Sequence, residues 1–171
     1  MEFKVLSSQD CEEVRLWRNE VPEALRTPYM LTEEQQEGFY DNVICDRNAK
    51  AKYWGVWEEN KFIGMTGIEN IEWENRRGEI SLILSPEYRG NGNGAIALDI
   101  LLHKGFNELN LQNIWGVCYE CNFKASTFWE REIVKRGLYY TMLPNMKYWR
   151  GKYWRGLYFN FERSKNEPDN T

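Results

Sequence analysis

The sequence has no run of about 18 consecutive apolar residues, and its opening MEFKVLSSQD holds no apolar signal core. We therefore expect neither a membrane span nor a secretory leader, and we predict a cytoplasmic protein. Basic residues are not in excess, because 22 Lys and Arg stand against 26 Asp and Glu, a net charge of −4. This balance argues against a general nucleic-acid binder or anionic-membrane binder, since both need a basic surface.

Cysteine and histidine are scarce, with four and one residues respectively. Cys118 and Cys121 form a CxxC, but Cys11 and Cys45 are single and far apart, so a zinc ribbon lacks its second pair. We therefore expect reduced cytosolic thiols and no bound metal. The single histidine, His103, falls in the middle of an apolar helical stretch, where packing is the expected role.

The secondary-structure elements that the sequence predicts follow the order β-α-α-β-β-β-α-β-α-β-β. Capping-box spacing marks two helix starts, at Asp10 with Glu13 and at Thr32 with Gln35. An antiparallel run of strands followed by one strand-helix-strand crossover predicts an α+β domain with a mixed sheet. The length fits a single domain, which we place at residues 1–163, with residues 164–171 as a flexible tail.

The stretch SLILSPEYRGNGNGAIALDILL, residues 81–102, carries the most chemical information. A strand runs into RGNGNG, residues 89–94, and then directly into an apolar helix. Glycines let the backbone approach a ligand, and the N–H groups of the turn and of the helix start form an anion cradle. Arg89 at its mouth adds a charge-assisted contact. We predict a phosphate or pyrophosphate site.

Two nucleotide motifs compete for this turn. No GK[ST] follows the glycines, which excludes a P-loop. Residues 92–97 fit the dinucleotide fingerprint G-x-G-x-x-A, and Glu120 lies near the end of the next strand, roughly where a ribose-binding acid would sit. A Rossmann unit normally opens with its fingerprint, whereas this turn follows four strands. An NAD-type oxidoreductase stays open as an alternative.

The turn Arg89-Gly90-Asn91-Gly92-Asn93-Gly94 matches the motif [QR]-x-x-G-x-[GA] of the GNAT superfamily of acyl-CoA N-acyltransferases, which the chain resembles. The ordered segments WRN (17–19), TEEQQ (32–36), FIGMTGIENI (62–71) and GFNELNLQNI (105–114) extend the resemblance over nearly the whole chain, and it is most like the RimJ/RimL type. The resemblance implies about seven strands flanked by about four helices, with a splayed strand pair as the acyl-CoA slot. Acetyl-CoA would be the donor.

By this resemblance, several residues would hold the donor. Backbone at Leu82, Ile83 and Leu84 would pair with the pantetheine arm, and Asn122 would reach its side. Trp129 stands where relatives carry a tyrosine. Backbone N–H groups would hold the pyrophosphate, from Gly90, Asn91, Gly92, Asn93, Gly94 and Ala95.

For transfer to an amine, Glu79 matches the position of the glutamate base of the RimJ/RimL type. The family's tyrosine acid is replaced by Trp129, whose indole N–H is no proton donor for catalysis, so Ser126, Tyr119 or solvent would protonate the thiolate. The expected acceptor is a primary amine: a protein N-terminus, a polyamine or an amino-sugar. A catalytically degenerate CoA-binding module remains a second alternative, and the expected assembly is a monomer or homodimer.

The segment KYWRGKYWRG, residues 147–156, contains the same aromatic and basic motif twice. Interleaved aromatics and cations can form a platform for single-stranded nucleic acid, yet the surrounding chain is acidic. We predict instead a closing β-hairpin that turns at Gly151–Lys152 and places Tyr148 opposite Arg155.

Overall fold

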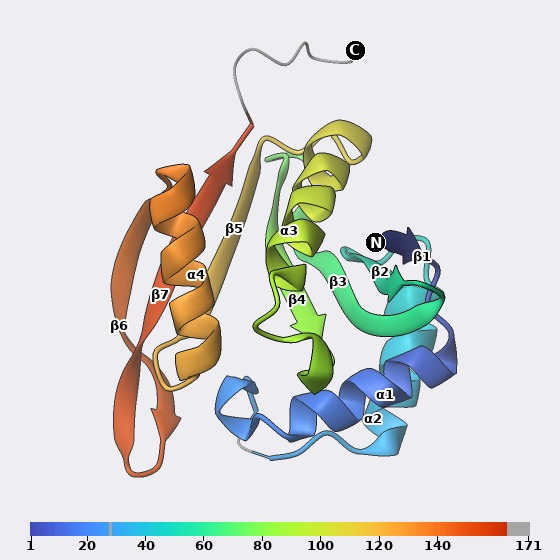
Figure 1. Ribbon diagram of the computed structural model, residues 1–171, viewed down its shortest axis with the longest axis horizontal. Helices are drawn as coiled ribbons and strands as arrows, with labels where there is room; N and C mark the ends of the chain where they lie inside the picture. The colour runs from blue at the N-terminus through green and yellow to red at the C-terminus, as the bar shows by residue number, and fades with distance from the viewer. Residues whose placement is uncertain (28, 164–171) are drawn as a thin grey trace.

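The computed structural model describes residues 1–27 and 29–163, so the predicted tail at 164–171 lies outside the described residues (Figure 1). Seven strands form one sheet in the order β1-β2-β3-β4-β5-β7-β6. Strands β4 and β5 run parallel, and the other neighbouring pairs of the described sheet are antiparallel. This topology confirms the predicted α+β class and its single crossover.

The elements also confirm the predicted order. The strands are β1 (Glu2–Lys4), β2 (Lys52–Glu58), β3 (Lys61–Glu72), β4 (Arg77–Leu84), β5 (Asn113–Tyr119), β6 (Tyr139–Trp149) and β7 (Lys152–Glu162). The α-helices are α1 (Ser8–Asn19), α2 (Glu33–Phe39), α3 (Asn93–His103) and α4 (Phe123–Arg136). Short 3-10 or π turns lie at Pro22–Ala24, Tyr40–Ile44, Pro86–Tyr88 and Lys104–Glu108.

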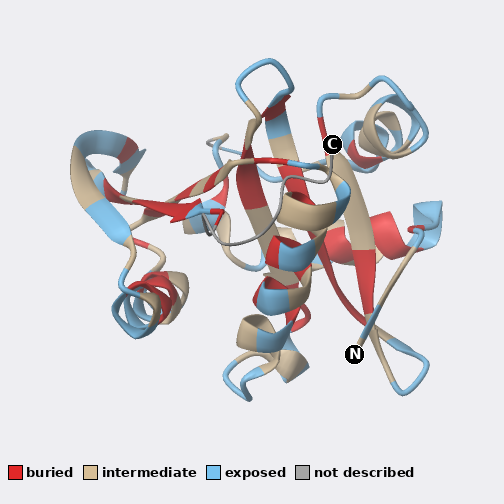
Figure 2. Ribbon diagram, turned by 90° about the horizontal axis from the view of Figure 1, so that it is seen from above, coloured by how far each residue is buried: buried red, intermediate tan, exposed pale blue. Residues whose placement is uncertain are grey.

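Helices cover both faces of the sheet, as Figures 1 and 2 show together. On one face, Leu98 and Leu101 of α3 and Ile133 of α4 pack against the central strands. On the other face, Val14 of α1 packs with Met65 of β3. Burial is concentrated on the central strands and the inward helix sides (Figure 2). Alternation along β4 therefore sends successive side chains into two different layers.

The predicted start of α1 was three residues too late. Ser7 is the N-cap, and Asp10 is the third helical residue whose carboxylate returns a hydrogen bond to the Ser7 N–H, 2.8 Å apart. Serine followed three residues later by aspartate satisfies two free donors in the same reciprocal way as Ser with Glu. The start of α2 is as predicted, with Thr32 as N-cap and Gln35 completing the box.

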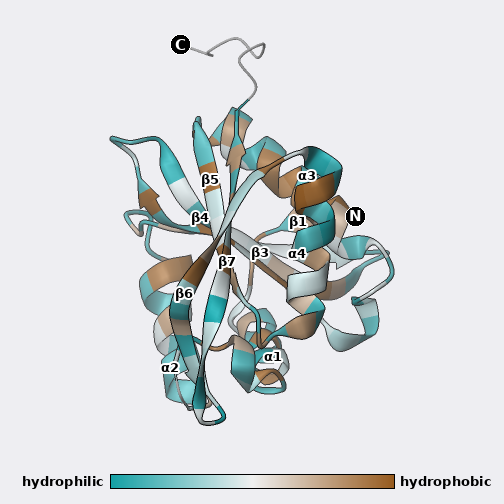
Figure 3. Ribbon diagram, turned by 90° about the vertical axis from the view of Figure 1, so that its left-hand side faces the viewer, coloured by the Kyte–Doolittle hydropathy of each residue, from teal (hydrophilic) through white to brown (hydrophobic). Residues whose placement is uncertain are grey.

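The closing hairpin turns one residue earlier than predicted. Arg150 and Gly151 form the turn with φ of 50° and 79°, so Tyr148 pairs with Tyr153 rather than with Arg155. Positive φ at both central residues is the geometry of a type I′ turn, which suits the twist of a hairpin. The two tyrosine rings meet edge to face at 5.2 Å. Figure 3 shows this hairpin in front, with a hydrophilic tip.

In the part of the chain that the structure describes, no helix is long and apolar enough to cross a membrane.

Candidate active site

The sheet opens between its two parallel strands. Strands β4 and β5 are paired at three positions, the last of them Glu79 opposite Trp115. Beyond this point β4 continues to Leu84 and β5 to Tyr119, and the two strands diverge (Figure 1). The facing edge of β4 from Ile80 onward is therefore left without a strand partner, as the expected splayed pair requires. Backbone groups at Leu82, Ile83 and Leu84 lie along this edge.

The glycine turn follows β4 and starts α3. Gly90 and Gly92 have φ of 84° and 87°, a left-handed backbone that side chains resist, and Gly92 is the N-cap of α3. A Cβ placed on either glycine would meet nothing within 4 Å, so open space lies in front of the turn. The first N–H groups of a helix have no carbonyl partner within it. Those of Asn93 and Gly94 therefore supply an anion cradle with the positive end of α3.

One hydrogen bond and one close approach between helices constrain this turn. The Nε of Arg89 donates to the Leu84 carbonyl at 2.8 Å, so the guanidinium folds back over the end of β4. A Cβ on Gly94 would lie 3.1 Å from the Phe128 ring, so a side chain there would press α3 away from α4. The predicted contacts of Arg89 and of residues 90–95 with a phosphate remain predictions.

Glu79 lies where the two strands separate, and its carboxylate is buried, with a side chain 3% exposed. Its Oε1 accepts from the Arg26 guanidinium, and its Oε2 accepts from Asn70 Nδ2 at 2.8 Å. Burial raises the pKa of Glu79, and the Arg26 charge and the Asn70 hydrogen bond oppose this rise. A carboxylate whose pKa is raised is a better proton acceptor than an ordinary glutamate.

A second carboxylate faces Glu79. Glu69 lies in β3 directly opposite Glu79, and the Arg26 guanidinium is 3.7 Å from it. A β-bulge between Glu69 and Glu72 shifts the register by one residue, and Asn70 within it has φ of 51°. Glu69 and Glu79 keep the register of the pairs from Gly64 to Ile68, and the shift begins beyond them. The bulge places Asn70, which donates to Glu79, beside the carboxylate pair.

Further polar groups enclose this pair. The Tyr53 hydroxyl donates to Glu69, and burial, followed by the Glu69 charge, raises the pKa of Tyr53 well above its usual value. Burial lowers the pKa of Arg18 on α1, and the nearby Tyr53 and Glu69 oppose this fall. These groups enclose the Glu69 side of the pair.

Tyr119 ends β5, across the divergence from Glu79. Burial raises the pKa of Tyr119, the nearby Arg26 charge opposes this rise, and the Glu79 charge adds to it. Lys147 Nζ lies 5.7 Å from the centroid of the Tyr119 ring and donates to the buried carbonyl of Leu25. The predicted residues Glu79 and Tyr119 thus both lie within electrostatic reach of Arg26.

The other predicted residues lie at the start of α4. Asn122 is its N-cap, accepting from the Ala125 N–H at 3.4 Å, and the buried Ser126 follows one turn later. Trp129 is also buried, and its ring stacks on Phe159 at 4.4 Å in the main core. That stacking gives the indole a packing role in the core, and the expected contact of Trp129 with the donor stays a prediction.

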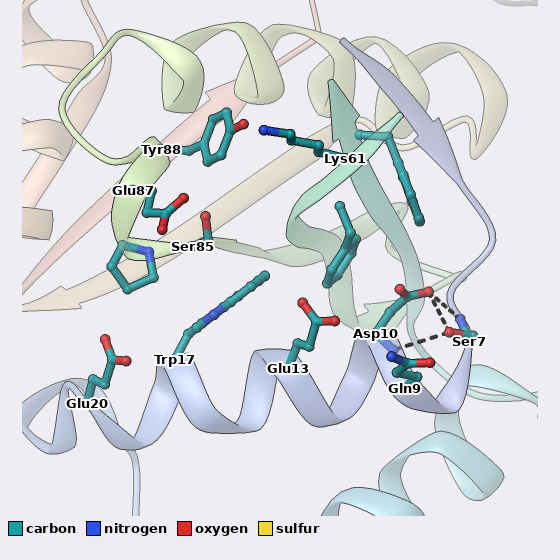
Figure 4. A pocket seen from close by; sticks show the side chains of 13 residues that line it. Ser7, Gln9, Asp10, Glu13, Trp17, Glu20, Lys61, Ser85, Glu87 and Tyr88 are labelled. Atoms are coloured by element: carbon teal, nitrogen blue, oxygen red, sulfur yellow. Dashed lines mark hydrogen bonds between the residues drawn. The ribbon is translucent and has the colours of Figure 1, made fainter. Parts of the chain in front are cut away.

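An open groove of about 920 Å³ lies beside α1. Glu13, Trp17 and Glu20 project from α1 toward Glu87 and Tyr88, which follow β4 (Figure 4). Its lining includes neither Glu79 nor Arg26, so it is a separate surface from the carboxylate pair.

The features behind the competing interpretations have other roles in the structure. Glu120, the candidate ribose acid, accepts from Arg155 at 2.7 and 3.0 Å. Cys118 and Cys121 are free and buried. No group of three metal-binding side chains occurs among residues 1–27 and 29–163.

Sequence reasoning missed Arg26, Asn70 and Lys147. Arg26 lies in an irregular segment between a 3-10 turn and α2, so no periodicity predicts where it points. Lys147 lies in the hairpin as predicted, but the residue is only 7% exposed and its side chain crosses to the Leu25 carbonyl, which the repeat does not indicate. The available signal was the excess of polar residues in IENIEWENRR, residues 68–77, which is compatible with a bulge.

Comparisons with known proteins agree with this geometry. The family model described as "Acetyltransferase (GNAT) domain" matches residues 2–131, well over half of the chain. The spermidine N(1)-acetyltransferase of Escherichia coli K12 is 30% identical over 99 residues, which cover 54% of this chain and 52% of that relative. The match thus spans about half the length of that relative.

Solved structures share the fold. The spermidine N-acetyltransferase of Vibrio cholerae in complex with CoA and spermine superposes with a TM-score of 0.81, at 20% identity and over 96% of both chains. A dodecameric structure of the spermidine N-acetyltransferase of Vibrio cholerae in an intermediate state gives a TM-score of 0.78 at 20% identity, over 96% of this chain and 94% of the other. With its splayed β4–β5 pair, its glycine turn and the match over residues 2–131, the chain belongs to the GNAT acetyltransferase family.

Proposed function

We propose that the protein is an acetyl-CoA-dependent N-acetyltransferase that transfers the acetyl group to a primary amine. One observation carries the proposal. The buried carboxylate of Glu79 lies at the point where β4 and β5 separate, beside an edge of β4 that leads to the glycine turn. A donor along this edge would present its thioester near Glu79, where the amine would attack.

The residues present fit this donor. Open space in front of Gly90 and Gly92, together with free N–H groups at the start of α3, suits a pyrophosphate. The unpaired edge at Leu82–Leu84 offers backbone hydrogen bonds to an extended, amide-containing arm, in the manner of an added strand. Asn122 stands at the start of α4, across the divergence, where it would reach the same arm.

The chemistry needs a neutral amine and an exit for its proton. Glu79, directly or through one water, accepts that proton as the amine nitrogen bonds to the thioester carbonyl carbon. The carbon–sulfur bond then breaks, and the thiolate takes a proton from Tyr119, from Ser126 or from solvent. A CoA thiolate leaves readily, so the acid is the less demanding role.

For the acceptor, the favoured candidate is a polyamine. Two relatives from different bacteria act on spermidine by name, and Glu69 and Glu79 place two carboxylates side by side where an ammonium group could bind. We therefore favour a polyamine over the other two expected acceptors, a protein N-terminus and an amino-sugar. The resemblance to the RimJ/RimL type concerns the sequence motifs and does not identify an acceptor. We also expect a cytoplasmic location and a monomer or homodimer.

Calorimetry with acetyl-CoA and with NAD tests the donor. We expect acetyl-CoA to bind and NAD to give no heat of binding, because the glycine turn leads into one crossover rather than a repeated strand-helix-strand unit. Tight NAD binding without acetyl-CoA binding would overturn the proposal in favour of an oxidoreductase.

A further inference from the structure

The carboxylate pair already has a cation between its members. Arg26 donates to Glu79 and lies 3.7 Å from Glu69, in the place that a substrate ammonium group would need. Both oxygens of Glu79 are engaged, Oε1 by Arg26 and Oε2 by Asn70. Each oxygen keeps a second lone pair, but the Arg26 guanidinium occupies the space beside Oε1 and between the two carboxylates, so an ammonium group can reach that place only when Arg26 moves.

The local charges point to the same requirement. Glu69 and Glu79 are balanced by the guanidinium groups of Arg26 and Arg18, both of which lie within electrostatic reach. An ammonium group added to this balanced set would bring an unpaired cation into a partly buried site, at a cost in free energy.

Of the two guanidinium groups, that of Arg26 is the one able to leave. The Arg26 side chain is 58% exposed, whereas Glu69 and Glu79 beneath it are 31% and 3% exposed. Arg26 can therefore turn into water without breaking core packing, and the arriving ammonium group replaces its charge beside the buried Glu79. Arg18 is partly buried, and this burial lowers its pKa, so moving it would disturb its packing.

The backbone next to Arg26 is held in place. The buried Lys147 of β6 donates to the Leu25 carbonyl, and Cys121 Sγ donates to the Glu23 carbonyl at 3.6 Å. A fixed backbone with an exposed side chain allows the guanidinium to move alone while the segment stays in place.

We propose that Arg26 is a specificity-determining residue. Its guanidinium fills the place of the substrate ammonium group between Glu69 and Glu79 in the free protein, and it moves aside when the amine binds. An acceptor then has to outcompete a guanidinium for the carboxylate pair. This favours an amine whose charge is not offset by its own carboxylate. The inference rests on the proposed function, because it takes Glu79 as the acceptor site.

The test compares Arg26→Gln, which keeps the length but not the charge, with Arg26→Lys, which keeps a cation. Arg131→Gln is the control, because Arg131 is an exposed arginine on α4 paired to its neighbour Glu132. Spermidine binding is measured by calorimetry on each protein saturated with CoA, alone and with methylguanidinium added. The kcat and KM for spermidine are measured on the same proteins with acetyl-CoA.

We expect Arg26→Gln to bind spermidine roughly fivefold to tenfold more tightly than the wild type, since no resident cation has to be displaced. Arg26→Lys and Arg131→Gln should bind like the wild type. Methylguanidinium should compete with spermidine in Arg26→Gln and much more weakly in the wild type, because it refills the vacated place.

Weaker spermidine binding by Arg26→Gln, or methylguanidinium that restores binding instead of competing, would overturn the inference, because Arg26 would then help to hold the substrate. Tighter binding by Arg26→Gln without thiol release from acetyl-CoA by the wild type would overturn the proposed function and leave Arg26 as assigned. Absence of spermidine binding by both proteins would overturn the acceptor and the role of Arg26 together.

Discussion

Glu79 has an environment that can tune a base. Burial raises its pKa, while Arg26 and Asn70 lower it in part. The sequence predicted Glu79 from its position in a motif, and alternation predicted its face. It could not predict Arg26, because the contact joins residues 53 positions apart through an irregular segment.

We predict that Glu79→Gln lowers kcat by roughly 100-fold or more, because the amide cannot accept the amine proton. Glu132→Gln is the matched control, since Glu132 is a buried glutamate paired with Arg136 on α4, away from the carboxylate pair. Steady-state kinetics with acetyl-CoA and spermidine provide the measurement. Equal kcat for the wild type and Glu79→Gln would rule out Glu79 as the base.

The pH dependence should show the raised pKa. The reaction needs unprotonated Glu79, so kcat/KM should fall on the acid side with an apparent pKa above that of an ordinary glutamate. Arg26→Gln removes a charge that lowers this pKa, so the acid limb should move to higher pH. If the acid limb of the kcat/KM profile stayed at the same pH in Arg26→Gln and was still present in Glu79→Gln, the titrating group would not be Glu79.

At the scale of elements, the turn between β4 and α3 and the turn of the closing hairpin both contain a glycine with a left-handed backbone conformation. Gly92 and Gly151 both have φ near 80° and open space around the missing Cβ. Glycine pattern and flanking periodicity predicted both turns. The exact hairpin register was missed because Arg150 adopts a left-handed φ, which a sequence pattern assigns to glycine first.

Substituting alanine at the two glycines separates strain from ligand binding. Gly92→Ala and Gly151→Ala should each lower the free energy of unfolding by about 1–2 kcal/mol, because alanine resists this φ. Thermal or urea unfolding measures that loss. Only Gly92→Ala should also weaken acetyl-CoA binding, measured by calorimetry. Equal acetyl-CoA affinity in both variants would remove the turn from the donor site.

At the scale of the whole molecule, topology was the most predictable feature. Element order and one crossover determine the seven-stranded mixed sheet, since hydrophobic periodicity extends over each whole element. The carboxylate pair was not predictable in the same way. It depends on the exact register of β3 against β4, and a one-residue shift would change which face a side chain occupies.

The cysteines report on the integrity of this fold. Cys45 is exposed, whereas Cys11, Cys118 and Cys121 are buried, and burial raises the pKa of Cys11 and of Cys118 to about 12. We predict that iodoacetamide modifies Cys45 in the native protein and all four thiols after unfolding, as measured by mass spectrometry. Rapid native modification of Cys118 would contradict the core described above.

The most direct test of the central claim is turnover by the wild-type protein. Acetyl-CoA is mixed with spermidine, spermine, an amino-sugar or an N-terminal peptide, and free thiol is measured beside the mass of each amine. The account predicts amine-dependent thiol release with one acetylated amine formed for each thiol, fastest with a polyamine. Acetyl-CoA binding without thiol release for any amine would contradict it and leave a CoA-binding module.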